Sequence, residues 1–142
     1  MARKQPKTAI QPNVQKLPKA SEEQHGDLLV WRFSSVDKAG PFGWDKLNDP
    51  AEYKSVMEKL HQFETMEQNA IYGGGSHPVP LSRLCNDAQK RLKAIKHDDV
   101  DQLMSFRLSG RQRVWCRMNN NIMSVLWWDP DHQVCPSTKK HT

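Results

Sequence analysis

The chain has 142 residues, with 21 Lys and Arg against 16 Asp and Glu and a formal net charge of +5. This length suits one domain with a single hydrophobic core. No stretch approaches the roughly 18 consecutive apolar residues of a transmembrane helix, so we expect no membrane partner. Three widely spaced cysteines without a CxxC pair favour free thiols in a reducing cytoplasm over a disulfide framework.

The net charge is concentrated at the N-terminus. Residues 1–20 hold five of the 21 basic side chains and no acid, which leaves 16 basic and 16 acidic side chains in residues 21–142. Residues 1–24 are predicted to be a disordered basic tail, because they cannot bury enough apolar surface to offset their ordering entropy. The tail is either a solubilising extension or an arm that contacts RNA phosphates. Residues 25–142 are predicted to form a single α+β domain.

The first predicted elements of this domain are a strand and a helix. Residues 28–33 form an apolar and aromatic run with the length of a buried strand. A helix is predicted to begin at Pro50, with Asp49 as its cap and Glu52 completing a capping box. Its apolar stripe consists of Tyr53, Val56, Met57, Leu60 and Phe63. The helix is expected to end before the three glycines at 73–75, which lack the strand and the Lys-Ser/Thr of a phosphate-binding loop.

A second helix is predicted after Pro78 and Pro80. Its buried face is expected to hold Leu81, Leu84, Cys85, Ala88, Leu92 and Ile95. Its outer face carries five basic residues, among them Lys90 and Lys93, against the single acid Asp87. Such a face is either simply solvated or contacts an RNA backbone.

Residues 103–128 are predicted to form three antiparallel strands. Apolar and polar side chains alternate in this region, and turns are expected at Ser109-Gly110 and at residues 119–121. The predicted order of elements is β-α-α-β-β-β, a C-terminal antiparallel meander packed on two helices, with the first strand added alongside the last three.

The meander contains the chemistry that we single out. Between Gln102 and Trp128 there are four arginines and no acid: Arg107, Arg111, Arg113 and Arg117. The strand period places Arg111, Arg113, Trp115 and Arg117 on one face, and the short turn brings Arg107 near Arg113. A bound phosphate would relieve the repulsion between these guanidinium groups, and Trp115 would be placed to stack a base. Alternatively, the arginines are an exposed strand face paired with Asp98, Asp99 or Asp101.

His132 follows the last predicted strand and is a candidate general acid or base. It stands in Asp129-Pro130-Asp131-His132, where a carboxylate could orient the ring, although the same residues also form an ordinary turn. Two aspartates and one histidine lack a fourth ligand at a recognisable spacing. We therefore expect neither a metal nor another cofactor.

Residues 106–117, residues 122–128 and Val134-Cys135 resemble the C-terminal half of the RelE/ParE toxin superfamily. The shared pattern is a basic and hydrophobic strand, a small turn, an Arg-Val pair and an apolar final strand. The similarity covers residues 81–135 in detail and residues 27–135 as a layout. It departs from the family at residues 128–132, where a Gly-His-Arg-like element is usual, and in having no tyrosine after Tyr72.

The resemblance implies a bacterial cytoplasmic toxin with a cognate antitoxin protein as partner. One branch of the family consists of metal-independent, ribosome-dependent messenger-RNA endonucleases, and the other poisons gyrase. By position, Arg113 corresponds to the ligand of the phosphate or transition state, Arg107 to a basic position on the preceding strand, and His132 to the segment where the family places His or Arg. The alternative is a non-catalytic module that docks an acidic protein or a nucleic acid through the same arginine face.

Overall fold

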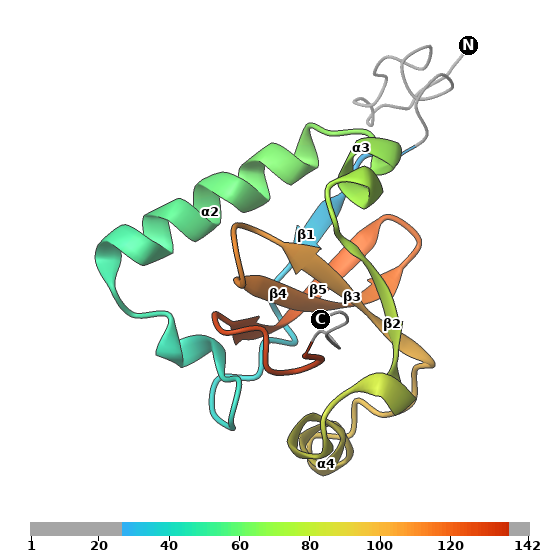
Figure 1. Ribbon diagram of the computed structural model, residues 1–142. Coiled ribbons are helices and arrows are strands. Elements are labelled where there is room, and N and C mark those ends of the chain that lie inside the picture. Colours follow the sequence, from blue (N-terminus) through green and yellow to red (C-terminus); the bar gives the residue numbers. More distant parts are fainter. Residues whose placement is uncertain (1–26, 137–142) are drawn as a thin grey trace, which may run out of the picture.

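The computed structural model describes residues 27–136, which form an α+β fold around a five-stranded mixed sheet (Figure 1). The strands are β1 (Val30–Arg32), β2 (His77–Pro80), β3 (Gln102–Arg107), β4 (Arg113–Asn119) and β5 (Ile122–Asp129). Their spatial order is β1-β5-β4-β3-β2. Strand β1 runs parallel to β5, and the other three pairings are antiparallel. The predicted tail at residues 1–24 lies outside the described residues.

Three α-helices and two short 3-10 helices accompany the sheet within residues 27–136. They are α2 (Pro50–Glu64), α3 (Gln68–Gly73), α4 (Asn86–Ala94), η2 (Trp44–Lys46) and η3 (Leu81–Arg83). The predicted cap of α2 is confirmed, since the backbone N–H of Glu52 donates to Asp49 Oδ2 at 2.9 Å. Tyr53 is not part of the buried stripe of α2, because 44% of it is exposed.

The predicted meander is confirmed as β3, β4 and β5. Gly110 and Asn120, at the two turns, have φ angles of 53° and 57°, a backbone region that glycine and asparagine tolerate best. A bulge between β4 and β5 shifts the register after Trp115. As a result, the consecutive residues Leu126 and Trp127 both belong to the same core cluster.

Strand β2 and the late start of α4 correct our prediction. The prolines at 78 and 80 were interpreted as the start of a helix, but they lie in β2, which pairs with β3 at the edge of the sheet. An edge strand tolerates proline, because one side of its backbone has no partner strand to which an N–H must donate. The order within the described residues is thus β-α-α-β-α-β-β-β.

Strand β1 is also different from the buried strand that we predicted. Leu28, Val30 and Phe33 are 40–46% exposed, whereas Leu29 is buried. The indole N–H of the half-buried Trp31 donates to Leu60 O of α2 at 2.9 Å. The apolar run therefore belongs to an edge strand with only one buried face.

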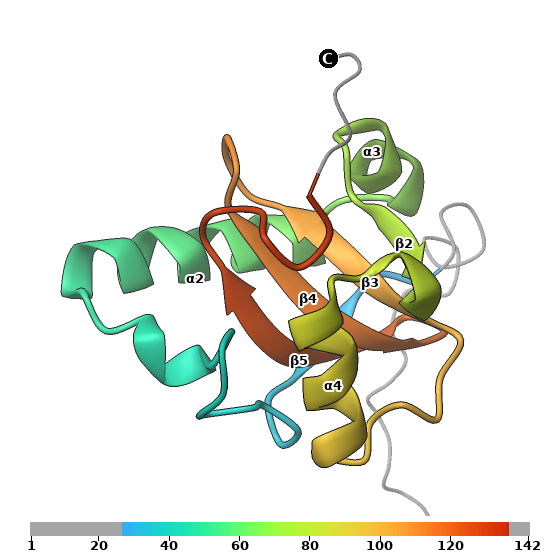
Figure 2. The same cartoon turned by 60° about the horizontal axis from the view of Figure 1, so that its bottom comes forward.

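The helices cover opposite faces of the sheet (Figure 2). Side chains of α2 and α3 pack with Met104, Phe106, Val114 and Cys116 on one face. Side chains of α4 pack with Leu103, Trp115 and Trp127 on the other, which we call the α4 face. The prediction of a meander packed on two helices did not anticipate this division, because the apolar stripe of a helix does not reveal which face of the sheet it covers.

Asp37 joins three distant parts of the chain below the α4 face. Its carboxylate accepts hydrogen bonds from Arg91 Nε at 2.9 Å and Nη2 at 2.8 Å, and from Trp127 Nε1 at 2.9 Å. Only 3% of the Asp37 side chain is exposed. Burial acts to raise the pKa of Asp37, but the hydrogen bonds from Arg91 and Trp127 outweigh it, and the pKa lies below the ordinary 3.8. The loop after β1 is thereby tied to α4 and β5.

We expect Asp37→Asn to lower the free energy of unfolding by about 2–3 kcal/mol, because it leaves the guanidinium of Arg91 without its charge partner. The loss is smaller than for a fully buried pair, since 27% of the Arg91 side chain contacts water. Urea denaturation measures the change. The exposed acid of the same region, Asp45, provides the control, and Asp45→Asn should change stability by less than about 0.5 kcal/mol.

The difference between wild type and Asp37→Asn should depend on pH. A carboxyl whose pKa falls on folding stabilises the fold above its unfolded pKa, and this contribution is lost as the pH falls through its folded pKa. The difference should therefore be constant above about pH 5 and shrink below about pH 4. A difference that persists unchanged at pH 2 would contradict the ionic role of Asp37.

Candidate functional site

Strand register places three charged residues side by side on the α4 face. Arg107 of β3 pairs with Arg113 of β4, which pairs with Asp129 of β5. The predicted proximity of Arg107 and Arg113 is thus confirmed. Like charges directly opposite each other on neighbouring strands destabilise a sheet. The two arginines therefore make this end of the sheet a place that favours an anion.

Arg113 is held in place by the hairpin turn that precedes it. Its Nη1 donates to Gly110 O at 2.8 Å and to Gln112 O at 3.1 Å. Desolvation by burial, followed by repulsion from Arg107, lowers the pKa of Arg113 from its ordinary value of 12.5. An arginine remains charged under such conditions. Its charge is consequently fixed in position and incompletely solvated.

Asp129 does not form an ion pair with Arg113 in the described part of the chain. It is 1% exposed, and its oxygens accept hydrogen bonds from Trp115 Nε1 at 3.1 Å, Gln133 N at 2.8 Å and Val134 N at 3.0 Å. The carboxylate that adjoins the arginines in register is thus used to hold the loop after β5. This leaves the charge of Arg113 available to a ligand.

The loop after β5 carries His132 over the arginine row. His132 has a φ angle of 58°, and the loop is further anchored where Cys85 N donates to Val134 O at 2.7 Å. Burial first, and then the charge of Arg113, lower the pKa of His132 from its ordinary 6.5. The imidazole is therefore mainly neutral at pH 7. In that form it can accept a proton.

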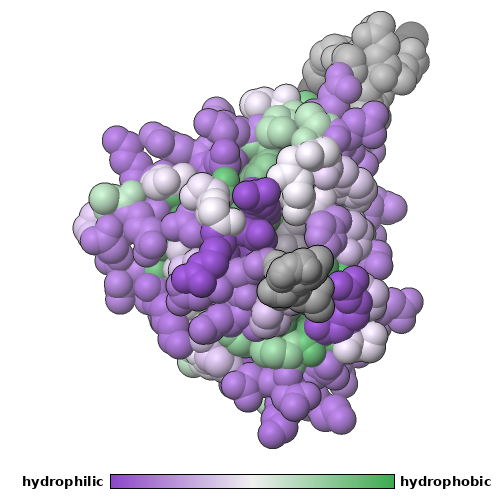
Figure 3. All heavy atoms as spheres, viewed as in Figure 1, coloured by the Kyte–Doolittle hydropathy of each residue, from purple (hydrophilic) through white to green (hydrophobic). Residues whose placement is uncertain are grey.

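His132 and Arg113 line one cavity of about 300 Å³, which we call the groove. Its remaining lining residues are Gly75, His77, Val79, Arg83, Ser105, Trp115, Cys135 and Pro136. On the face shown in Figure 3, the most hydrophilic side chains gather above the β3–β4 hairpin and beside β2. The catalytic hypothesis requires one phosphate to reach both groups, and the two residues line the same cavity.

His77, Arg83 and Ser105 were missed by the sequence analysis. His77 and Ser105 are register partners on β2 and β3, and Arg83 ends η3. His77 escaped notice because β2 was not recognised, although the alternation of His-Pro-Val-Pro was a signal for a strand. Arg83 had been assigned to the outer face of a helix. In the structure it lines the groove as a second arginine with Arg113, whereas Arg107 is not among the lining residues.

The glycines at 73–75 contribute space for an arginine. A Cβ on Gly75 would lie 3.1 Å from Arg107 Cδ, and the φ of Gly75 is 99°, a conformation that disfavours side chains. The next residue, Ser76, is buried, and its Oγ accepts a hydrogen bond from Arg107 N at 2.9 Å. These contacts hold the base of the Arg107 side chain against the segment between α3 and β2.

Trp115 does not have the predicted role of a stacking platform. It is 1% exposed, and its indole N–H is bonded to Asp129. It forms part of the floor of the groove, with no open ring face against which a base could lie. The prediction was wrong because the alternation along a strand shows on which face of the sheet a side chain lies, but not which other segments cover that face.

Arg117 and Arg111 do not line the groove. Arg117 pairs with Asp99 at 3.2 Å and contacts His97, so for this residue the alternative of an arginine paired with a nearby aspartate is correct. Arg111 lies 3.8 Å from Asp131, with both side chains more than half exposed. Such an exposed pair contributes little to stability, and the Arg111 guanidinium can still bind another anion.

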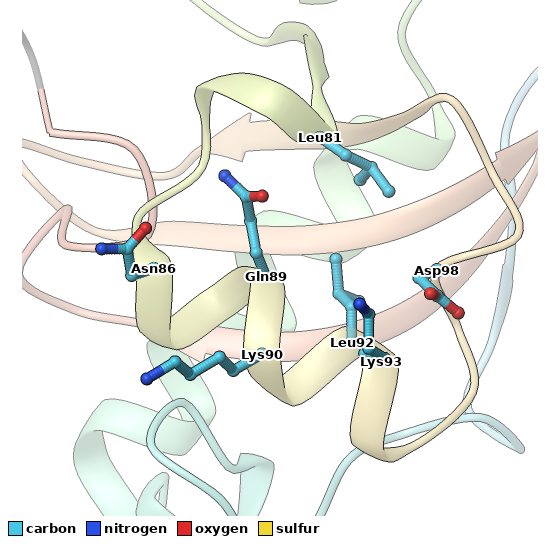
Figure 4. A pocket seen from close by; sticks show the side chains of 7 residues that line it. All are labelled: Leu81, Asn86, Gln89, Lys90, Leu92, Lys93 and Asp98. Carbon is cyan, nitrogen blue, oxygen red and sulfur yellow. The ribbon is translucent and has the colours of Figure 1, made fainter.

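Lys90 and Lys93, the predicted RNA contacts on α4, are exposed and line a different cavity (Figure 4).

Of the groove residues, Cys135 is a poor nucleophile, because burial raises the pKa of its thiol above the ordinary 9.0. Residues 27–136 contain no group of three or more His, Cys, Asp or Glu placed to hold a metal ion. Over the same residues, no helix is long and apolar enough to cross a membrane.

Comparison of the chain with models of known protein families, with curated protein sequences and with solved structures gives no match in any of the three. The geometry of the groove is thus the basis for assigning a function.

We expect Arg113→Met to raise the pKa of His132, because it removes the largest electrostatic cause of the lowered pKa while burial of the ring persists. NMR titration of the histidine ring protons measures this change. Arg117→Met is the matched control on the same strand, since Arg117 does not contribute to the pKa shift of His132. An identical His132 titration in wild type and Arg113→Met would show that the two side chains do not share the groove.

Proposed function

We propose that the chain is a RelE-like toxin of a toxin–antitoxin pair and that it cleaves RNA without a metal. The observation that carries the proposal is the single cavity lined by Arg113 and His132. The resemblance of residues 81–135 to the RelE/ParE superfamily adds the partners: messenger RNA on the ribosome in the bacterial cytoplasm, and an antitoxin protein. A face that only docked an acidic partner would have no need of a neutral histidine beside its arginines.

Arg113 and Arg107 would hold the phosphate whose bond is broken. Guanidinium groups donate parallel hydrogen bonds to two oxygens of one phosphate. They stabilise the charge that develops on these oxygens in the transition state, and they do so most strongly where water is partly excluded. The lowered pKa of Arg113, caused first by its burial, is a sign of such exclusion. The charged side chains take the place that a metal ion occupies in other nucleases.

His132 would act as the general base. Its neutral imidazole takes the proton from the RNA 2′-hydroxyl, and the 2′-oxygen then attacks the adjacent phosphorus. The bond from phosphorus to the 5′-oxygen of the next nucleotide breaks, and that oxygen takes a proton from water. The hydroxide left behind takes the proton from the His132 imidazolium, which regenerates the base. The products are a 2′,3′-cyclic phosphate and a 5′-hydroxyl. Depression of the pKa of His132, first by burial and then by Arg113, keeps the base in its active form at neutral pH.

Expression of the wild-type chain in a bacterium should arrest growth and cleave messenger RNA. Arg113→Ala should reduce cleavage by about 10²–10³-fold through loss of charge stabilisation, and His132→Ala by about 10²–10⁴-fold through loss of the base. Growth curves and mapping of RNA 5′ ends measure these effects. The cleavage rate of wild type should fall as the pH drops and His132 becomes protonated.

Arg117→Ala is the control, because Asp99 already pairs with this arginine outside the groove. It should leave cleavage unchanged. Harmless expression of wild type and variants alike would reject the toxin. RNA binding that depends on Arg113 without any cleavage would instead identify the chain as a non-catalytic binding module, and growth arrest with broken DNA and intact RNA would indicate the gyrase branch.

A further inference from the structure

A second cavity, of about 440 Å³, lies between η3, α4 and the loop that leads into β3. It is lined by Leu81, Asn86, Gln89, Lys90, Leu92, Lys93 and Asp98. Figure 4 shows Leu81 of η3 and Leu92 of α4 pointing toward each other, with Asp98 on the loop beside them. Its volume is within the range of small-molecule sites. We call it the α4 cavity.

The α4 cavity combines an apolar floor with a polar rim. Leu81 and Leu92 are partly and fully buried and belong to the core beneath α4. On the rim, Gln89 Nε2 donates to Leu84 O at 2.8 Å, which orients the amide and leaves its oxygen as an acceptor. Within residues 27–136, the side chains of Asn86 and Asp98 have no hydrogen-bond partner. The rim thus offers donors and acceptors above an apolar floor, of which Leu81 is the more exposed part.

The charge at the mouth of the α4 cavity favours a ligand that carries an anion. Lys90 and Lys93 are exposed, and neither forms an ion pair with another described residue. Figure 4 shows Lys90 extending along the outside of α4, away from the two leucines. The α4 cavity thus favours a ligand with a planar, hydrogen-bonding group in the cavity and an anionic group at its mouth. A nucleotide has both groups.

The α4 cavity and the groove are neighbours through η3. Leu81 lines the α4 cavity and Arg83 lines the groove, and these are the first and last residues of η3. A 3-10 helix rises only about 2 Å per residue, so both cavities border the same short segment of the chain.

We propose that the α4 cavity binds one base of the RNA, next to the nucleotide whose phosphate lies in the groove. The proposal rests on the function inferred above and adds a determinant of specificity. The base lies against Leu81, its edge meets Asp98, and its phosphate meets Lys93. The carboxylate of Asp98 only accepts hydrogen bonds, which favours bases with an amino group over uracil.

Titration of the ¹⁵N-labelled full chain with each 5′-mononucleotide and with inorganic phosphate tests the α4 cavity without requiring cleavage. The backbone amides of Gln89, Leu92 and Lys93 should shift with the cytosine, adenine and guanine nucleotides, more weakly with the uracil nucleotide, and not with phosphate alone. Asp98→Asn should reduce the preference for the cytosine over the uracil nucleotide by roughly tenfold. Equal shifts with phosphate alone would overturn the base site.

Leu81→Trp tests whether the ligand occupies the α4 cavity, and Lys93→Ala tests the charge at its mouth. Leu81→Trp fills the α4 cavity and should abolish the amide shifts, and Asp98→Asn, at an exposed position, keeps the test decisive if the tryptophan variant does not fold. Lys93→Ala should weaken nucleotide binding several-fold. Lys54→Ala, an equally exposed lysine on α2 at the opposite face of the sheet, is the matched control and should not affect it.

The outcomes separate this site from the proposed function. If RNA cleavage depends on Arg113 while the amides lining the α4 cavity stay unshifted and Asp98→Asn leaves the cleavage pattern unchanged, the base site is wrong and the nuclease stands. If mononucleotides bind the α4 cavity but no RNA is cleaved, the base site stands and the nuclease fails. Absence of both binding and cleavage overturns the two proposals together.

Discussion

Two buried carboxylates that receive indole N–H groups are the constraint on which the rest of the structure depends. Trp115 and Trp127 are cross-strand partners in the middle of the sheet, and both are covered by the α4 side of the core. A buried indole needs an acceptor for its N–H. Asp129 provides it for Trp115 and Asp37 for Trp127. A buried carboxylate needs further hydrogen-bond donors. Arg91 of α4 donates to Asp37, and backbone N–H groups of the loop after β5 donate to Asp129.

The first carboxylate ties α4 to the sheet, and the second positions the groove. Asp37 brings α4 against the sheet through Arg91 and anchors the loop after β1, whose backbone also bonds to β5. Asp129 turns the chain after β5 back over the sheet through two backbone N–H groups, which places His132 above Arg113. The loop that carries His132 is therefore fixed through Asp129 to Trp115, which forms part of the groove floor.

The distribution of charge on the α4 face depends on which groups the neighbouring aspartates bind. Arg117 lies near the loop that contains Asp99 and is neutralised by it. Arg113 has Asp129 as its register partner, but the oxygens of Asp129 are occupied by the indole and the loop. Unbalanced positive charge thus remains at one end of the face, beside Arg107. This charge favours an anionic ligand, and the lowered pKa of His132 places a mainly neutral imidazole in the same cavity as Arg113.

The sequence by itself determined the features that depend on local geometry. The cap of α2 at Asp49, the two turns of the meander and the pairing of Arg107 with Arg113 all follow from residues close together in the chain. Strand β2, the placement of the helices on opposite faces and the burial of Trp115 depended on which segments cover one another, and no local pattern carries that information. Only the tertiary structure decided that Arg113 and His132 line the same cavity. The position of His132 depends on the loop after β5, which is held by backbone N–H groups that donate to Asp129.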